Sequence, residues 1–364
     1  MRLGPLEGLV REVVAARRTP PDRPAAPGAL AVDLAAVLRF RARATRLDGR
    51  LAAGSWREAA YGGLQDSAPR AALLGLHARM DGVRPGSWED PALVQVWFRR
   101  SDYVVPAADF GVFTLGTLPR DPERAAAIEE LAGTACGVLD GRALRTSEVA
   151  SAVGAAGRAF LDIASAAARY RIRWDARTVT VHATDRPDVD PEDARRELAR
   201  RFLGWHGPAS VDQFAKWAGI TRADAGATWA ALAPEIVPVE LDGRARDVLA
   251  RDVEAMTRSE RPRGVRFLPH GDPYLVLDRA EALVGCPPPP TADEAGAPLT
   301  TRLVNSLAGV ILVDGRVAGA WGRAQERMAI HLWRQDDPDR ERIAADAEGF
   351  AGPIGRPVRL RWLR

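Results

Sequence analysis

Apolar positions in the first part of the chain recur with a helical period and then change to a strand period. Val37 and Leu38 follow Leu34 by three and four residues, which places the three on one face of a helix. Ser55, followed three residues later by Glu58, forms a capping-box pattern at the start of a second helix. The expected elements are helices over 31–46, 55–64 and 70–80, followed by a strand pair over 92–106. Three helices followed by a hairpin is the order of a winged helix-turn-helix.

The same order of patterns occurs twice more along the chain. The second copy has expected helices over 122–137, 146–153 and 157–170 and a hairpin over 171–183. The third copy begins with a helix over 190–206. In its helix-turn-helix segment, Ser210 is expected to cap one helix, Gly219 to end it and Thr221 to cap the next. The strand-like stretch 236–243 then takes the place of the wing.

The remainder of the chain is dominated by strand-like patterns. Asp314 and Gly315 stand between two alternating apolar runs, which predicts a tight hairpin with both turn residues at positive φ. Four consecutive prolines at 287–290 predict a surface loop. The other expected elements are strands in the segments VRFLP, YLVLD, RMAIHLWRQ and VRLRW and a helix over about 337–348.

These patterns together predict an α+β protein built of three tandem winged helix-turn-helix units and a C-terminal antiparallel β-barrel-like domain. A length of 364 residues allows more than one domain. The predicted segments are an N-terminal helix with a proline-rich connector over 1–29, winged helices over 30–121, 122–186 and 187–263, and the β-domain over 264–364.

The composition excludes several classes of protein. No run of 18 apolar residues occurs, so we expect no transmembrane helix, and Glu7 and Glu12 interrupt what would be the core of a signal peptide. The two cysteines, Cys136 and Cys286, form no metal-binding pair and are expected to be reduced thiols. The five histidines lack metal-ligand spacing, and no phosphate-binding loop motif is present. We therefore expect a cytoplasmic protein with no membrane association.

Arginine supplies almost all of the positive charge. Of 51 basic residues only Lys216 is a lysine, and the formal net charge is +3. A GC-rich genome explains much of this bias, but guanidinium groups still favour contacts with phosphates. Three winged-helix units that carry such groups favour binding to duplex nucleic acid. The candidate contacts are Arg99 and Arg100 beside the first wing, Arg171, Arg173 and Arg177 in the second hairpin, and Arg195, Arg196, Arg200 and Arg201 in the third unit.

The arginines of the third unit have an alternative interpretation. They share a predicted helix with Glu192, Asp193 and Glu197, so they could form a solvated face of ion pairs. Arg99 and Arg100 lie inside a strand-like pattern and have no such simple alternative.

Five segments of the chain carry a resemblance to a known family. They are GLQDSAPRAALLGLHARM (63–80), WFRRSDYVVPAADF (97–110), ARRELARRFLGWHGPASVDQFAKWAGI (194–220), VRFLPHGDPYLVLDR (265–279) and VILVDGRVAGAW (310–321). In this order they resemble the AlkZ/YcaQ-type winged-helix DNA glycosylases, and the similarity runs from about residue 31 to the end of the sequence.

The resemblance implies a fold and an activity. It implies three winged helices and a β-barrel that embrace damaged duplex DNA, without a metal or an organic cofactor. Characterised members of the family release alkylated purines, including those in interstrand crosslinks, and some protect producers of DNA-damaging antibiotics. Their catalytic motif is Gln–aliphatic–Gln or Gln–aliphatic–Asp in the first winged helix.

The matching positions in this chain are Gln65, Asp66 and Ser67, which depart from that motif after the first glutamine. Gln65 could orient a water molecule for attack on the sugar. Asp66 brings a negative charge, but at the middle position, and Ser67 is a weaker acceptor than Gln or Asp. The alternative is that Asp66 or Ser67 caps the helix that begins near Pro69. Arg70, which follows in the same segment, joins the predicted DNA-binding residues.

The function expected from the resemblance is that of a monofunctional DNA glycosylase, acting in DNA repair or in self-resistance to genotoxins. Lys216 lies within a helix-turn-helix and is expected to be exposed, so a Schiff-base strand cleavage is not expected. The expected partner is double-stranded, damaged DNA, bound by a monomer associated with the nucleoid. The departure from the catalytic motif leaves an alternative: an inert DNA-binding protein for lesion recognition or transcriptional regulation. A partner-binding scaffold is the weaker third possibility.

Overall fold

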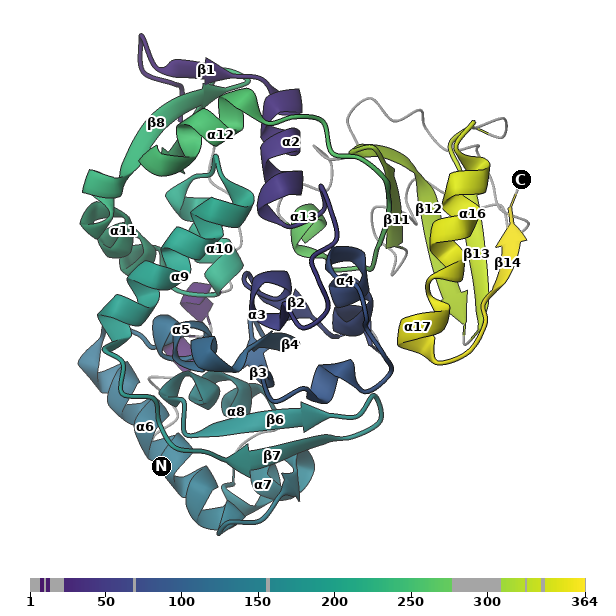
Figure 1. Ribbon diagram of the computed structural model, residues 1–364. Coiled ribbons are helices and arrows are strands. Elements are labelled where there is room, and N and C mark those ends of the chain that lie inside the picture. Colours follow the sequence, from purple (N-terminus) through teal and green to yellow (C-terminus); the bar gives the residue numbers. More distant parts are fainter. Residues whose placement is uncertain are drawn as a thin grey trace, which may run out of the picture. The chain divides into compact units, whose positions relative to one another are not determined.

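The computed structural model describes residues 7–9, 11–13, 23–67, 70–154, 158–276, 309–324, 326–334 and 338–363 of the chain. They form a mixed α+β protein (Figure 1) whose internal contacts divide it into two units. Unit 1 comprises Met1–Asp33, Tyr61–Gly63 and Pro91–Glu254, and unit 2 comprises Leu34–Ala60, Leu64–Asp90 and Ala255–Arg364. Among the described helices, none combines the length and the hydrophobicity needed to cross a membrane.

One sheet of unit 1 is built from two hairpins. β3 pairs with β4 along its whole length, β6 pairs with β7, and Gln95 of β3 lies opposite Ile172 of β6. Both hairpins lie where the strand-like patterns predicted them. The strands are β3 (Leu93–Phe98), β4 (Ser101–Pro106), β5 (Leu144–Arg145), β6 (Tyr170–Trp174) and β7 (Val179–Ala183).

Helices α6 (Pro122–Leu139), α7 (Thr146–Ala152) and α8 (Arg158–Ala164) pack around the core of this sheet. Proline at the first position of α6 and the Asp121 carboxylate, which accepts from the amide of Arg124 at 2.9 Å, fix its start as predicted. α8 ends before the predicted residue 170, because Tyr170 begins β6 and is buried in the core.

A second part of unit 1 contains three helices followed by a hairpin. The Ser210 hydroxyl accepts from the amide of Gln213 at 3.2 Å, and the Gln213 side chain accepts from the Ser210 amide at 2.8 Å. Gly219 has a φ of 72°, and the Thr221 hydroxyl accepts from the Asp224 amide at 3.1 Å. All three predicted boundaries are thus confirmed. The elements are α9 (Pro191–His206), α10 (Val211–Ala218), α11 (Arg222–Ala231), β8 (Ile236–Leu241) and β9 (Arg244–Leu249), with β1 (Leu30–Val32) parallel to β8.

Aromatic side chains hold these helices together. The ring of Phe202 on α9 lies 5.4 Å from that of Phe214 and 5.2 Å from that of Trp217 on α10, measured between centroids. α11 turns Thr228 and Trp229 towards this core, so both are buried. The opposite, exposed side of α11 carries Arg222, Ala223, Gly226, Ala230 and Ala231.

Unit 2 contains an open five-stranded sheet in the order β10-β11-β12-β13-β14. The predicted turn is confirmed, because Asp314 and Gly315 join β11 to β12 with φ values of 49° and 77°. The sheet is mainly antiparallel, as predicted, since three of its four pairings are antiparallel and only β13 and β14 are parallel. The predicted barrel is not formed, because the edge strands β10 and β14 do not pair in the described residues. The strands are β10 (Val265–Leu268), β11 (Gly309–Val313), β12 (Arg316–Ala324), β13 (Arg327–Leu332) and β14 (Arg359–Trp362).

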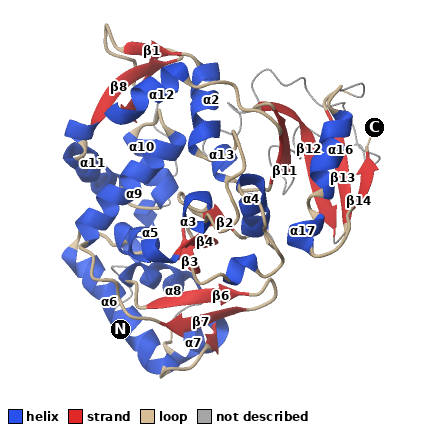
Figure 2. Ribbon diagram, viewed as in Figure 1, coloured by secondary structure: helices blue, strands red, loops and turns tan. Residues whose placement is uncertain are grey.

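One face of this sheet packs against α16 (Arg340–Glu348) and α17 (Ala351–Ile354), as Figure 2 shows. Phe267 of β10, Trp321 of β12 and Phe350 form a trio of rings with centroids 5.3 to 5.7 Å apart. Leu74 joins the same core from α4 (Ala71–Arg79). The core of unit 2 therefore supports both the sheet and the helix that follows the Gln65-Asp66-Ser67 segment.

Two predicted elements of unit 2 differ from the structure. The helix expected over 55–64 is a single turn, α3 (Trp56–Ala59), and the Ser55 side chain makes no capping bond. Gly63, which the prediction placed within this helix, has a non-helical φ of +81°. The segment YLVLD was predicted as a strand, but Pro273–Val276 form the helical turn α13. The Asp272 carboxylate begins this turn by accepting from the Tyr274 amide at 3.0 Å. Residues 277–278, the prolines at 287–290 and Cys286 lie outside the described residues.

The remaining elements are α2 (Leu34–Ala44) and β2 (Leu64–Gln65) in unit 2, α5 (Phe110–Phe113) in unit 1, and α12 (Val253–Arg258), which spans the boundary in sequence.

His77 on α4 predicts a pH dependence of stability. Its ring meets Phe350 edge-on at 5.1 Å, and burial, with the charges of Arg50 and Arg266 nearby, lowers its pKa to about 4. In the unfolded chain the imidazole takes up a proton near pH 6.5. The stability from neutral His77 is therefore complete above pH 6.5 and is lost as the pH falls towards 4, up to about 3 kcal/mol.

Urea unfolding of wild type and His77→Gln between pH 7.5 and 4.5 measures this contribution. The difference between the two free energies of unfolding should shrink as the pH falls. Taking this difference cancels the contributions of all other titrating groups, including Asp346. Parallel curves would contradict the assignment.

Candidate functional site

The Gln65-Asp66-Ser67 segment leads from β2 into α4 within unit 2. Ala71, Ala72 and Leu76 of α4 are buried, so the segment is attached to a helix that is fixed in the core. Ala68 and Pro69 lie outside the described residues. The positions of the three predicted catalytic side chains follow from this attachment.

Asp66 is anchored to the beginning of α4. Its side chain is buried, and its Oδ1 accepts from the backbone amide of Ala72 at 3.0 Å. Its Oδ2 lies 3.6 Å from Nη1 of Arg70. A carboxylate at a helix N-terminus is stabilised by the amides and by the helix dipole. The alternative in which Asp66 caps this helix is thus what the structure shows.

Gln65 and Ser67 are joined to each other by their side chains. Nε2 of Gln65 donates to the Ser67 hydroxyl at 2.7 Å. Gln65 is half-buried and Ser67 is exposed. Because this bond holds the amide nitrogen of Gln65 towards Ser67, it fixes the direction in which the carbonyl oxygen of the same amide points. The pair therefore forms an oriented amide at the edge of the solvent.

Arg70 is held within unit 2 rather than extended into solvent. Its guanidinium carbon lies 3.8 Å from the centroid of the Trp88 ring, and its side chain is 19% exposed. A guanidinium stacked on an aromatic face and paired with a carboxylate is well ordered. Arg70 also has a φ of 63°, which turns the chain sharply into α4. Its predicted role in DNA binding stays a prediction, beside this evident structural role.

Behind the segment lies a fully buried ion pair. Arg79 near the end of α4 donates to both carboxylate oxygens of Asp272, at 2.7 and 2.8 Å, and neither side chain is exposed. Asp272 belongs to the segment 265–279 that carries part of the family resemblance. The arginine partner could not be found from the sequence, because 193 residues separate the two members of the pair.

Arg99 and Arg100 form the turn between β3 and β4 in unit 1 rather than lying inside a strand. Their φ values are 56° and 62°. Two adjacent residues at positive φ define a tight hairpin turn that normally takes asparagine and glycine. Each left-handed arginine costs about 1–2 kcal/mol relative to glycine. Arg99 donates to the Tyr103 hydroxyl at 2.7 Å, whereas Arg100 is exposed.

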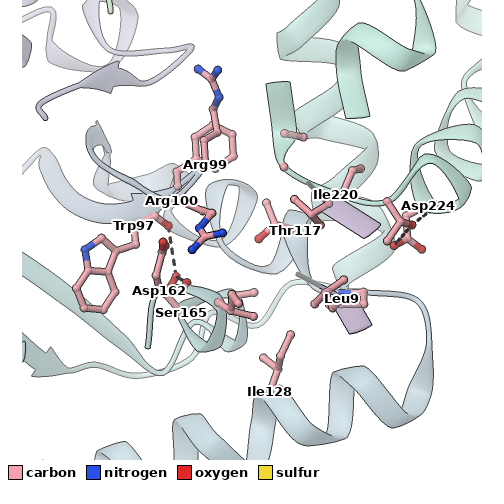
Figure 3. Close-up of a pocket in the computed structure, with 18 residues that line it drawn as sticks. Leu9, Trp97, Arg99, Arg100, Thr117, Ile128, Asp162, Ser165, Ile220 and Asp224 are labelled. Carbon is pink, nitrogen blue, oxygen red and sulfur yellow. Dashed lines mark hydrogen bonds between the residues drawn. The ribbon is translucent and has the colours of Figure 1, made fainter. Parts of the chain in front are cut away.

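This turn stands at the edge of a pocket within unit 1 (Figure 3). Apolar side chains such as Ile128, Ile163 and Ile220 line it. Among its polar side chains, the Ser165 hydroxyl donates to the carbonyl of Asp162 at 2.6 Å. Arg99 and Arg100 are both part of the lining, and Arg100 is exposed.

The β6–β7 hairpin presents a polar and basic outer face. Arg171, Arg173 and Arg177 are exposed, whereas Ile172 between the first two is buried. His182 lies opposite Arg171, and its pKa is lowered by burial and by the charges of Arg171 and Arg173. The neutral imidazole adds hydrogen-bonding capacity beside two cations, as suits contact with phosphate oxygens.

The arginines of α9 follow the alternative interpretation of ion pairing. Arg196 pairs with Asp193, and Arg200 pairs with Glu235 at 2.7 Å. Arg195 and Arg201 are buried, and Arg201 pairs with Asp109 at 2.9 Å. The ion-pair alternative therefore describes these four residues as the structure has them.

Three comparisons show which known proteins the chain is similar to. The family model described as DNA glycosylase AlkZ-like matches residues 59–352. A Streptomyces sahachiroi protein named interstrand DNA cross-link repair glycosylase is 24% identical over 316 residues, which cover 76% of this chain and 74% of that protein. The solved structure of Streptomyces sahachiroi DNA glycosylase AlkZ superimposes with a TM-score of 0.69 at 18% identity, over 92% of this chain and 100% of that one. Since the family model spans most of the sequence, the chain belongs to the AlkZ-like DNA glycosylase family.

Proposed function

We propose that this protein is a monofunctional DNA glycosylase that releases alkylated or crosslinked purines from damaged duplex DNA. The observation that carries the proposal is the oriented amide of Gln65, held by Ser67 at 2.7 Å within a segment that the family model covers. The name of the Streptomyces sahachiroi relative, an interstrand cross-link repair glycosylase, supports crosslinked purines as a substrate class.

The chemistry needs little more than a positioned water molecule. An alkylated purine carries a positive charge and is a good leaving group, so the N-glycosidic bond breaks with its electrons moving to the base. The water oxygen forms a bond to the sugar C1′, and one proton is released to solvent. The carbonyl oxygen of Gln65 accepts a hydrogen bond from that water and stabilises the cationic sugar by its dipole.

The other two candidates have supporting roles in this proposal. Ser67 orients the Gln65 amide, and Asp66 fixes the segment to α4, because its carboxylate accepts from Ala72 and faces Arg70. Lys216, the single lysine of the chain, is exposed on α10. We propose that the product is an intact abasic site, because strand cleavage through a Schiff base needs a lysine amine at the reacting sugar and this proposal places Lys216 outside the site.

The proposed architecture follows the order of the elements. Three helices and a hairpin, best seen in α9, α10, α11 and the β8–β9 hairpin, support three winged-helix segments over 30–121, 122–186 and 187–263. We propose that the protein acts as a monomer on nucleoid DNA in the cytoplasm. Arg99, Arg100, Arg171, Arg173 and Arg177 are its proposed phosphate contacts.

A base-release assay tests the function. Duplex oligonucleotides that carry N7-alkylguanine, N3-alkyladenine or a nitrogen-mustard crosslink are incubated with the protein and then cleaved at abasic sites with hot alkali. Alkali-dependent cleavage without strand breaks before alkali is expected. Tight, salt-sensitive binding with no base release from any of the three substrates would instead favour an inert DNA-binding protein.

Arg100→Asn is expected to weaken DNA binding without loss of stability. Asparagine tolerates the left-handed turn better than arginine, so the midpoint of thermal unfolding should stay the same or rise. Loss of one phosphate contact should reduce the slope of log K against log salt by about 0.9. Arg142→Gln is the matched control, because the Arg142 guanidinium donates to the carbonyls of Val138 and Leu139 at the end of α6. Equal slopes for the two variants would remove Arg100 from the interface.

A further inference from the structure

The buried ion pair between Arg79 and Asp272 holds the turn after β10 in place within unit 2. Arg79 contributes both terminal nitrogens to Asp272 and also donates to the carbonyl of Gly75 at 3.0 Å. Asp272 in addition accepts from the Tyr274 amide at 3.0 Å. The turn that follows β10 is thereby attached to α4 by two parallel hydrogen bonds, and each of the two charged groups makes one further bond within its own segment.

Stability alone does not explain such a pair. Desolvating both charges costs much of what their attraction returns, and apolar side chains of similar volume often stabilise a core equally well. A bidentate pair does provide orientation, because its two parallel bonds allow only one geometry. The pair therefore determines the position of a group that the turn contacts.

That group is Gln65. Gly271, next to Asp272, has a φ of +77°, and its backbone lies against the Gln65 side chain. A methyl group at position 271 would stand 2.6 Å from Oε1 and 3.0 Å from Cδ of Gln65, well inside van der Waals contact. The amide is thus bounded by Gly271 on one side and bonded to Ser67 on another.

We infer that Gly271 and the Arg79–Asp272 pair form a positioning device for the Gln65 amide. Gly271 leaves just enough space for the amide, and the ion pair keeps the glycine at that distance. Both are positioning residues that act through Gln65 and touch no substrate. The inference rests on the proposed catalytic role of Gln65, and it adds three residues to the machinery.

The test compares Gly271→Ala with Gly141→Ala. Gly141 has a φ of +72° and nothing within 4 Å of a methyl group at that position. The two substitutions therefore share the same backbone strain, and only Gly271→Ala meets the Gln65 amide. Gly271→Ala is expected to lower the single-turnover rate of base release by about 10–100-fold, in line with a misplaced catalytic group. Its affinity for duplex DNA should stay within twofold of that of Gly141→Ala.

A readout independent of activity accompanies the rate. In ¹⁵N-labelled protein, the side-chain amide signals of Gln65 are identified by their loss in Gln65→Ala. These signals should shift in Gly271→Ala and stay in place in Gly141→Ala. Unshifted signals, or equal rates for the two glycine variants, would overturn the inference even where wild type is active. Shifted signals in a protein that releases no base would support the positioning contact and reject the proposed glycosylase function.

Discussion

Gln65→Ala is expected to lower the single-turnover rate of base release by about 10²–10⁴-fold, the range that removal of one oriented catalytic group produces. The physical reason is that alanine has no acceptor to hold the attacking water and no dipole to face the cationic sugar. DNA affinity should change little, because the side chain is half-buried and uncharged. The assay is release of N7-alkylguanine from a duplex oligonucleotide with protein in excess.

Substitutions of the two neighbours serve as controls for this prediction. Ser67→Ala should cost about tenfold or less in rate, because the amide loses only the partner that orients it. Asp66→Ala should mainly lower stability, by about 0.5–2 kcal/mol, since it removes an anchor at the start of α4. A rate that survives Gln65→Ala but falls by 10²-fold or more in a still-folded Asp66→Ala would assign the chemistry to Asp66 instead.

The second large effect concerns the buried ion pair. Asp272→Leu leaves the Arg79 guanidinium buried without its carboxylate, and the free energy of unfolding should fall by about 3–5 kcal/mol. Adding Arg79→Met should restore most of that loss, because both charges are then gone and the volume is retained. Urea unfolding of wild type, both single variants and the double variant gives the coupling energy as a double-mutant cycle.

The double variant also separates stability from positioning. Its stability should approach that of the wild type, whereas its base release should stay slow because the turn at Gly271 is no longer held by a bidentate pair. A stable double variant with the wild-type rate would show that the pair contributes only to folding. Additive losses in the cycle would mean that the two charges do not interact, contrary to the 2.7 and 2.8 Å bonds.

Local chemistry made much of the fold predictable from the sequence. Ser210, Gly219 and Thr221 each act through neighbours within four residues, so their patterns are complete within a short segment. The same holds for the Asp314-Gly315 turn, whose backbone geometry both residues favour. The resemblance to the family was carried by five segments in order, and the family model over residues 59–352 confirms it.

Features that depend on distant partners could not be predicted in this way. The apolar run at Tyr274 resembles a strand, and the Asp272 side chain that begins a helical turn there is itself fixed by Arg79. The parallel pairing of β14 with β13 leaves no mark on either strand's own pattern. The contact between Gly271 and Gln65 likewise joins segments some 200 residues apart in the sequence, and no pattern of apolar and polar residues predicts it.

The exposed side of α11 has a consequence for base-sequence preference wherever this helix contacts DNA. Its side chains are alanine, glycine and a single arginine, and that arginine lies 3.1 Å from the carboxylate of Asp212. Reading a base sequence in the major groove requires side chains that donate to or accept from base edges. The exposed side of α11 has almost no side chains of this kind. An α11 that contacts DNA through this surface is expected to bind undamaged duplexes of different sequence with similar affinity.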